Sequence, residues 1–197
     1  MTQLTITIDN TDTARTTWRY LTQSASEISA DIGSSMMDFL TKRLGFPEEY
    51  IDSQIKTIFI NGKPVDDLYS ATIPENARIA LGAVAPGVAG MTMCRNSPIS
   101  ALRGAITYEN ADQPQNIKEG TVTLLLFNAV MEDKGLELLS KGLTVQATKI
   151  EHALSDAPES VLTAVLDKTS LSTQKLIEWI QKNPQLKVQL RVKASSE

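Results

Sequence analysis

The chain has 197 residues, and 42% of them are hydrophobic, which is enough for a packed core and excludes a disordered protein. The formal net charge is −4: residues 1–90 hold 7 basic and 11 acidic residues, and residues 91–197 hold 12 of each. Neither half has the basic excess that binding to nucleic acid phosphates requires, so we expect no nucleic acid partner.

The sequence also predicts a cytoplasmic protein without a membrane partner. Its longest apolar run, at residues 124–127, is much too short to span a bilayer. Residues 1–10 lack the basic start and the apolar stretch of a signal peptide. Cys94 is the only cysteine, so an internal disulfide is excluded.

The first predicted elements are two strands that pair as a hairpin. Residues 4–8 alternate between apolar and polar side chains, which is typical of a half-buried strand. After a turn-rich segment, residues 17–22 are aromatic and rich in strand formers, and we expect them to form the second strand.

A helix is predicted over residues 24–44. Ser24 and Glu27 match a capping box, in which the hydroxyl and the carboxylate satisfy free backbone amides at a helix start. Gly45 is expected to end the helix, and Pro47 prevents its continuation. The apolar residues in between recur mainly at intervals of three and four: Ile28, Ile32, Met36, Phe39, Leu40 and Leu44.

Two more strands and a hairpin limb complete the first half. Residues 55–60 are rich in strand formers, and Asn61-Gly62 is the favoured pair for a type I′ hairpin turn. The return limb begins at Pro64, which predicts an edge or short strand because proline has no backbone N–H. Residues 77–81 form the last strand, so the predicted order is β-β-α-β-β.

The second half alternates between strands and helices. The predicted elements, in order, are a strand at 105–108, a polar loop at 109–119, an apolar strand at 121–127, a helix at 128–141 ended by Gly142, a strand at 143–147, short helices opened by the capping boxes at 148–151 and 156–159, a helix opened by Ser172, and an amphipathic strand at 186–192.

Residues 58–67 and 71–81 resemble the second half of a ubiquitin-like β-grasp domain. The resemblance rests on a strand followed by Asn61-Gly62, and on the turn at residues 74–76 before the last strand. It is strongest to the small sulfur carriers, such as the molybdopterin synthase small subunit and the thiamine-pathway carrier. The order β-β-α-β-β is also what that fold implies.

The expected fold class is therefore α+β. We expect an N-terminal β-grasp (ββαββ) domain over residues 1–90, a connector over residues 91–100, and a second α/β unit of unassigned fold over residues 101–197. In this second unit, residues 121–127 would form the central strand.

The resemblance implies a functional tail at residues 86–90, with Gly87 and Gly90 as the carrier-tail candidates. Sulfur carriers use a free glycine carboxylate at the end of a flexible tail that enters a partner's active site. Here Ala89 replaces one glycine of the terminal pair, and more than a hundred residues follow. Carrier chemistry would therefore need cleavage of the chain after Gly90.

Cys94 is the candidate for a reactive thiol, because a neighbouring cation such as Arg95 can favour the thiolate. The only histidine, His152, lies far along the chain in a predicted helix, so no base is assigned to this thiol. One cysteine and one histidine cannot make a zinc site, and neither Asp66-Asp67 nor Glu48-Glu49 has the spacing of a calcium loop. We assign no catalytic residue, no metal site and no cofactor.

Three functions remain open from the sequence. The favoured one is a non-catalytic protein-interaction or binding module built on the β-grasp domain, with a protein partner and with any small-molecule ligand unassigned. The second is a sulfur-carrier-like protein activated by cleavage after Gly90. The third is an enzyme with its site at the domain junction near Cys94.

Overall fold

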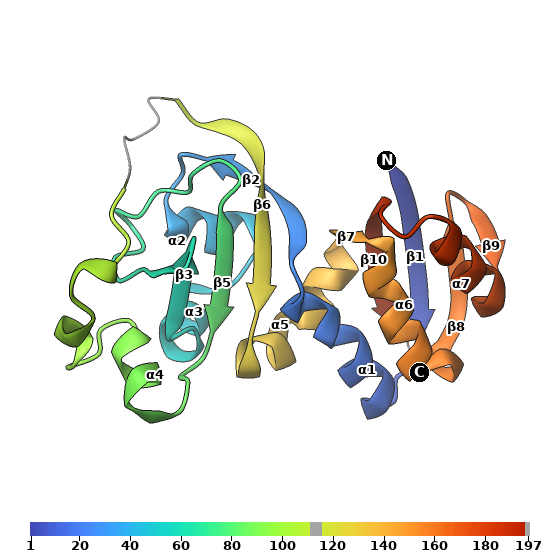
Figure 1. The fold of residues 1–197 in the computed structure, drawn as a ribbon, viewed down its shortest axis with the longest axis horizontal. Helices are drawn as coiled ribbons and strands as arrows, with labels where there is room; N and C mark the ends of the chain where they lie inside the picture. Colours follow the sequence, from blue (N-terminus) through green and yellow to red (C-terminus); the bar gives the residue numbers. More distant parts are fainter. Residues whose placement is uncertain (111–115, 196–197) are drawn as a thin grey trace. The chain divides into compact units, whose positions relative to one another are not determined.

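The computed structural model describes residues 1–110 and 116–195. The chain divides into two compact units, which we call unit 1 and unit 2. Unit 1 combines Met1–Ser26 with Met131–Glu197, and unit 2 is the continuous segment Glu27–Val130. Each unit contains strands and helices, so the protein has a mixed α/β structure (Figure 1).

Unit 1 is built on five strands in the order β7-β10-β1-β8-β9. Strands β1 and β10 are parallel, and all other neighbours are antiparallel. Its elements are β1 (Thr2–Ile8), α1 (Asp12–Arg19), the 3₁₀ turn η1 (Tyr20–Gln23), α5 (Asn128–Lys141, beginning just before the unit boundary), β7 (Leu143–Gln146), α6 (Ala147–Asp156), η4 (Pro158–Ser160), β8 (Val161–Leu166), β9 (Thr169–Leu171), α7 (Thr173–Lys182) and β10 (Lys187–Ala194).

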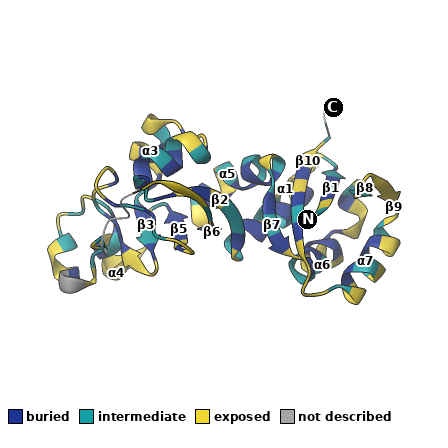
Figure 2. Cartoon of the chain, turned by 90° about the horizontal axis from the view of Figure 1, so that it is seen from above, coloured by how far each residue is buried: buried dark blue, intermediate teal, exposed yellow. Residues whose placement is uncertain are grey.

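The core of unit 1 lies on one face of this sheet. Leu4 and Ile6 of β1 lie opposite Leu190 and Val192 of β10, and all four are buried. Helices α6 and α7 cover this face (Figure 2). Because neighbouring residues of a strand point to opposite faces, the polar residues between them lie on the other face.

Unit 2 is built on strands in the order β4-β3-β5-β6-β2. Strands β5 and β6 are parallel, whereas β3 is antiparallel to both β4 and β5. Its elements are β2 (Ser26–Ile32), α2 (Met36–Asp38), the π-helical turn η2 (Phe39–Arg43), α3 (Glu48–Gln54), β3 (Thr57–Ile60), β4 (Lys63–Pro64), β5 (Arg78–Gly82), α4 (Gly87–Met93), the 3₁₀ segment η3 (Ser100–Ile106) and β6 (Lys118–Leu126).

The hairpin of unit 2 follows the predicted turn chemistry. Asn61 and Gly62 have φ angles of 51° and 79°, the positive values that a type I′ turn needs at both positions. Strand β4 is short and lies at the sheet edge, as Pro64 predicted. The backbone N–H of Tyr108 donates to the Pro64 carbonyl at 2.8 Å, so the outer side of β4 is partly covered.

Most strands of the chain and helices α5 and α7 of the second half are confirmed. The expected strands at 4–8, 55–60, 77–81, 121–127, 143–147 and 186–192 correspond to β1, β3, β5, β6, β7 and β10. The helix at 128–141 is α5, and Gly142 follows it with φ 111°. Ser172 caps α7 by accepting a hydrogen bond from the Lys175 N–H.

The strand predicted at residues 17–22 is wrong, because this segment is the end of α1 followed by η1. Thr11 caps the helix by accepting from the Ala14 N–H at 3.2 Å. Ala14, Trp18 and Leu21 are buried at spacings of four and three, which is one face of a helix. Strand propensity favoured the same aromatic residues, and the helical burial pattern outweighs it.

The helix predicted at residues 24–44 is wrong over its first half. Residues Ser26–Ile32 form strand β2, and helical structure begins only after Ser35, whose hydroxyl accepts from the Asp38 N–H. Ile28 and Ile32 are four residues apart, a spacing that fits a helix and also fits every second residue of a strand. Gly33, with φ 89°, separates the strand from the helix, whereas Gly45 ends the helical segment as expected.

Three further differences concern the region after β5 and the end of the chain. Part of the expected connector is helix α4, and the strand expected at 105–108 is replaced by η3 and extended chain. Part of the loop expected at 109–119 lies outside the described residues, and β6 already begins at Lys118. The hairpin of β8 and β9 was not predicted, although Asp167 and Lys168 both have positive φ angles.

The boundaries of the compact units also differ from the expected division at residues 91–100. Strands β5 and β6 lie on opposite sides of that segment in the sequence, yet they pair in the same sheet. Strand β1, expected to pair with the second strand of the first half, instead pairs with β10 and β8. The observed order up to residue 90 is therefore not the expected β-β-α-β-β.

Candidate functional site

The two carrier-tail candidates lie in helix α4. Gly87 is its first residue and has a φ angle of 83°. Gly90 lies inside the helix, close to the loop before it: a Cβ atom at Gly90 would lie 2.2 Å from the carbonyl oxygen of Ala85. The structure therefore places both glycines in a folded turn and helix packed on the preceding loop.

The candidate thiol of Cys94 follows directly after α4 and is 8% exposed. It donates to the Gly90 carbonyl at 3.4 Å and lies 3.7 Å from the Thr57 hydroxyl. Neither a carbonyl nor a hydroxyl takes a proton from a thiol at neutral pH. The structure brings Cys94 together with Gly90, and His152 lies in α6 of unit 1.

Arg95 is held away from solvent by carbonyl groups. Its guanidinium donates to the Ile55 carbonyl at 2.9 Å and to the Ile51 carbonyl at 3.0 Å, and it lies 3.8 Å from the Asp52 carboxylate. Burial lowers the pKa of Arg95 from its usual value, and the charge of Asp52 opposes this shift. Arg95 therefore anchors the end of α4 to the turn between α3 and β3.

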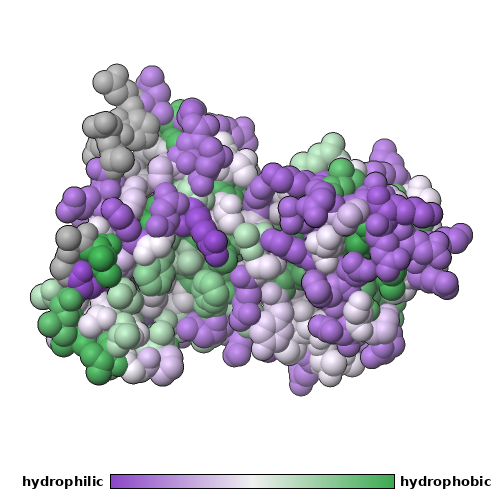
Figure 3. Space-filling model, viewed as in Figure 1, coloured by the Kyte–Doolittle hydropathy of each residue, from purple (hydrophilic) through white to green (hydrophobic). Residues whose placement is uncertain are grey.

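Exposed apolar side chains gather around α4 and η3. Val88 and Met91 are 68% and 48% exposed and lie one helical turn apart. Leu102 and Ile106 of η3 are 73% and 47% exposed, and Val84 in the loop before α4 is 54% exposed. Helix α4 contacts η3, and Figure 3 shows apolar atoms concentrated over this part of unit 2. We call these five residues the α4–η3 surface.

The buried side chain of Arg103 connects the two segments that form this surface. The Arg103 side chain is 2% exposed; it pairs with Asp66 and donates to the carbonyls of Thr92 and Met93 at 3.2 and 3.4 Å. The two carbonyls belong to the last turn of α4, so Arg103 ties η3 to the end of that helix. The relative position of the two segments is therefore fixed by charge-assisted hydrogen bonds.

Unit 2 also contains a pocket of about 410 Å³ near the edge strand β4. Ile32, Ile60 and Pro74 line its apolar part, and Tyr108 and Lys63 contribute polar groups. The Tyr108 hydroxyl donates to the Thr72 carbonyl at 2.9 Å, and burial raises the pKa of Tyr108 above its usual value. The pocket can accept a small group, and its lining also includes Glu75, Glu109 and Lys118, of which Glu75 and Lys118 form an ion pair at 2.7 Å.

Among the described residues, no cluster of three or more His, Cys, Asp and Glu side chains could hold a metal ion. Asp66 is engaged with Arg103, and Asp67 accepts backbone hydrogen bonds from Tyr69 and Ser70. The Ser70 side chain is the largest cause of the lowered pKa of Asp67. These contacts explain both acids as structural groups.

In the described ranges, no helix has the combined length and apolar character that crossing a bilayer requires. Comparison with protein-family models, with curated proteins and with solved structures gave no match.

The α4–η3 surface was missed by the sequence interpretation, although a signal for it exists. Residues 79–94 contain no charged side chain, and within this run Val88 and Met91 have helical spacing. The glycines and the proline of the run favoured a tail or connector, and that interpretation hid the apolar face.

Proposed function

We propose that this protein is a non-catalytic protein-binding module and that the α4–η3 surface docks its partner. The observation that carries the proposal is the grouping of five exposed apolar side chains on two connected segments. Contiguous apolar patches of this kind on a monomer mark interaction sites, because exposing them to water is unfavourable.

Two further observations support this function. Arg103 and Arg95 fix η3 and the end of α4 by buried hydrogen bonds, and a rigid surface loses little entropy when it binds. Within the described residues, the hydrogen-bond partners of the Cys94 thiol are the Gly90 carbonyl and the Thr57 hydroxyl, which are not bases, and this favours the binding module over the enzyme alternative.

As part of this proposal, we infer that unit 2 has a β-grasp fold. Strand β2, the helical segment 36–54, the hairpin β3–β4 and strand β5 follow one another in the chain. The strand between β2 and β5 is β6, which comes last in unit 2. We infer that β6, rather than β1, takes the role expected of the first strand.

The sulfur-carrier alternative finds no supporting observation. Cleavage after Gly90 would cut helix α4 and would remove β6 from the interior of the sheet. The direct check is the intact mass of the protein isolated from its own cells. A chain ending at Gly90 would favour a carrier, and a full-length mass alone would exclude it.

The docking proposal is tested with a surface variant, Val88→Gln/Leu102→Gln, used as bait in affinity capture from native lysate. Both positions are more than two-thirds exposed, so the variant is expected to fold as the wild type does. We expect a partner that the wild-type chain captures to be lost, because removing central apolar contacts weakens an interface.

The matched control is Leu162→Gln/Leu186→Gln, which changes two exposed leucines of unit 1. This control should capture the same partner as the wild type. Identical capture by all three proteins, or capture of no specific partner by the wild type, would contradict the proposal.

A further inference from the structure

Unit 1 has one sheet face that lies away from helices α6 and α7 and carries exposed residues of β10. Helices α6 and α7 lie on the opposite face, where Leu4, Leu190 and Ile180 are buried (Figure 2). On the face away from α6 and α7, Thr5 lies opposite Arg191 and Thr7 lies opposite Lys193. We call this surface, formed by Lys187, Gln189, Arg191, Lys193, Thr5 and Thr7, the basic strand face.

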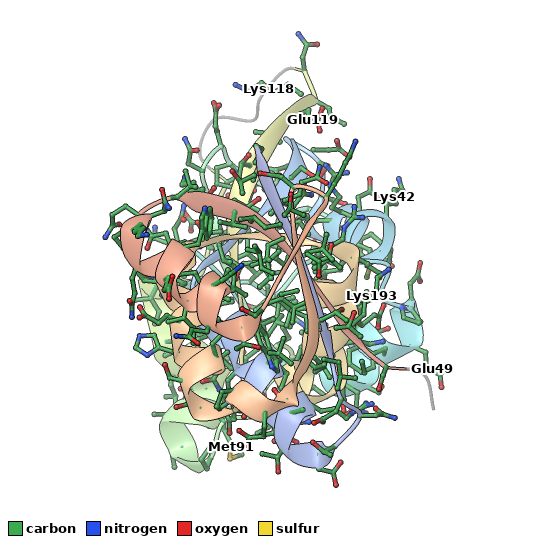
Figure 4. All side chains as sticks on the ribbon, turned by 90° about the vertical axis from the view of Figure 1, so that its right-hand side faces the viewer. Lys42, Glu49, Met91, Lys118, Glu119 and Lys193 are labelled. Carbon is green, nitrogen blue, oxygen red and sulfur yellow. The ribbon has the colours of Figure 1, made fainter. Side chains whose placement is uncertain are left out.

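The charge of this face has a single sign. The five strands of unit 1 contain three ionisable residues, Lys187, Arg191 and Lys193, and all three are cations on β10. Their alternation with the buried residues Val188, Leu190 and Val192 places them together on the other face of the sheet. Figure 4 shows Lys193 on the side of the sheet away from α6 and α7.

Two of these cations are available to a ligand. In the described part of the chain, Arg191 and Lys193 form no ion pair, and both residues are exposed. The Arg191 side chain rests over Gly142: a Cβ atom there would lie 3.3 Å from the Arg191 Nε. Because Gly142 has no side chain, the Arg191 guanidinium can rest against it. This contact restricts the conformations of the Arg191 side chain before a ligand binds.

The spacing of the charges fits an extended acidic chain. Residues two apart on a strand are separated by about 6.6 Å, and acidic residues that alternate along an extended peptide have the same separation. The hydroxyls of Thr5 and Thr7 lie beside the two cations and can donate hydrogen bonds to carboxylates.

From this complementarity we propose that the basic strand face binds an acidic, extended segment of a partner protein. A nucleic acid fits less well, because the whole chain is acidic and the five strands of unit 1 contain no aromatic residue on which a base could stack. The proposal uses residues of unit 1 only, so it stands apart from the docking function of the α4–η3 surface.

The test is a fluorescence anisotropy titration of the full chain with a labelled nonapeptide of alternating glutamate and threonine. A second peptide with glutamine in place of glutamate measures the charge-independent part. We expect the glutamate peptide alone to bind, and its binding to weaken as salt rises from 0.05 to 0.5 M (ionic strengths of roughly this range screen exposed pairs).

Two double variants with the same change of net charge test whether the peptide binds at the basic strand face. Arg191→Gln/Lys193→Gln should weaken binding of the glutamate peptide about five- to tenfold, the loss of two exposed ion pairs. Lys175→Gln/Lys182→Gln, on the exposed side of α7, should bind as the wild type does. Circular dichroism of both variants checks that the fold is retained.

Three results would overturn the proposal. The first is no binding of the glutamate peptide by the wild type. The second is an equal loss of binding in the two variants, which would show only a dependence on net charge. The third is tighter binding of a nonameric oligothymidylate than of the glutamate peptide, which would assign the face to nucleic acid.

Discussion

At the residue scale, the segment from Gly82 to Cys94 shows how one sequence supports opposite interpretations. Three glycines and a proline predict a flexible tail, yet Gly87 meets a need of the backbone angle and Gly90 a need of close packing. Gly87 takes a φ angle that side chains disfavour, and Gly90 lies where a side chain would overlap the Ala85 carbonyl. Glycine composition alone does not distinguish flexibility from close contact.

The contact between Gly90 and Ala85 predicts that an alanine at position 90 destabilises the protein, whereas helix propensity predicts that it stabilises the protein. Gly90→Ala should stabilise a helix interior by about 1 kcal/mol on propensity alone. Because the new Cβ would lie 2.2 Å from a backbone oxygen, we expect instead a loss of stability, and overpacking of this kind costs about 1–3 kcal/mol. The measurement is the urea midpoint followed by circular dichroism.

The neighbouring exposed position supplies the control for this change. Ala89→Ser should shift the free energy of unfolding by less than about 0.5 kcal/mol, as surface substitutions do. A Gly90→Ala chain as stable as the wild type, or more stable, would mean that the 83–86 loop does not pack on α4.

A second prediction at this scale uses the raised pKa of Tyr108. A group whose pKa is raised in the folded state contributes stability below its unfolded pKa, about 10 for tyrosine, and this stability is lost as the pH rises further. Tyr108→Phe should cost about 1 kcal/mol at pH 8, from the lost hydrogen bond to Thr72. The difference between the two proteins should then shrink above pH 10.

Urea midpoints measured from pH 8 to about pH 11 test this dependence, because the other tyrosines and the lysines titrate equally in both proteins. A difference between wild type and Tyr108→Phe that stays constant or grows with pH would contradict the burial of the phenol.

At the element scale, segments whose sequence pattern fits one kind of secondary structure were predicted correctly. Segments whose pattern fits both a helix and a strand were not. The β3–β4 hairpin needs positive φ angles at Asn61 and Gly62, and few other sequences meet that need. By contrast, Ile28 and Ile32 fit a helix and a strand equally, and only the place of β2 next to β6 decides for the strand. Helix α1 was missed because its residues have high strand propensity.

The place of β6 between β5 and β2 gives a prediction about a shortened chain. A protein ending at Gly90 lacks β6, and with it the buried residues Val122, Leu124 and Leu126. We expect this 1–90 chain not to fold, because the sheet of unit 2 would lose an interior strand. Circular dichroism and proton NMR dispersion measure the outcome, and a cooperatively folded 1–90 chain would revive the carrier hypothesis.

At the scale of the whole molecule, unit 2 is a continuous segment, whereas unit 1 is assembled from both ends of the chain. We therefore expect a fragment of residues 24–130 to fold alone, because its strands, helices and core all lie within it. A cooperative urea transition and dispersed NMR signals would confirm this.

The two tryptophans provide a complementary measurement on the full chain. Trp18 and Trp179 both belong to unit 1, so their fluorescence reports on that unit alone. A 24–130 fragment without a cooperative transition, together with coincident fluorescence and circular dichroism transitions in the full chain, would show that unit 2 depends on unit 1.

The sequence by itself determined the features that depend on neighbouring residues: the hairpin turn at Asn61-Gly62, the cap at Ser172, the end of α5 at Gly142 and the alternation of β10. The roles that it assigned to Gly87, Gly90 and Cys94 stay predictions, and it did not reveal the exposed apolar side chains around them.

Only the tertiary structure decided which strands pair and which faces remain open. Strands β1 and β10 pair although they lie near opposite ends of the sequence, and β5 and β6 pair although helix α4 lies between them in the sequence. Such pairings depend on contacts between distant residues, and no local spacing encodes them. For the same reason, the exposure of the α4–η3 surface and of the basic strand face follows from what the rest of each unit leaves uncovered.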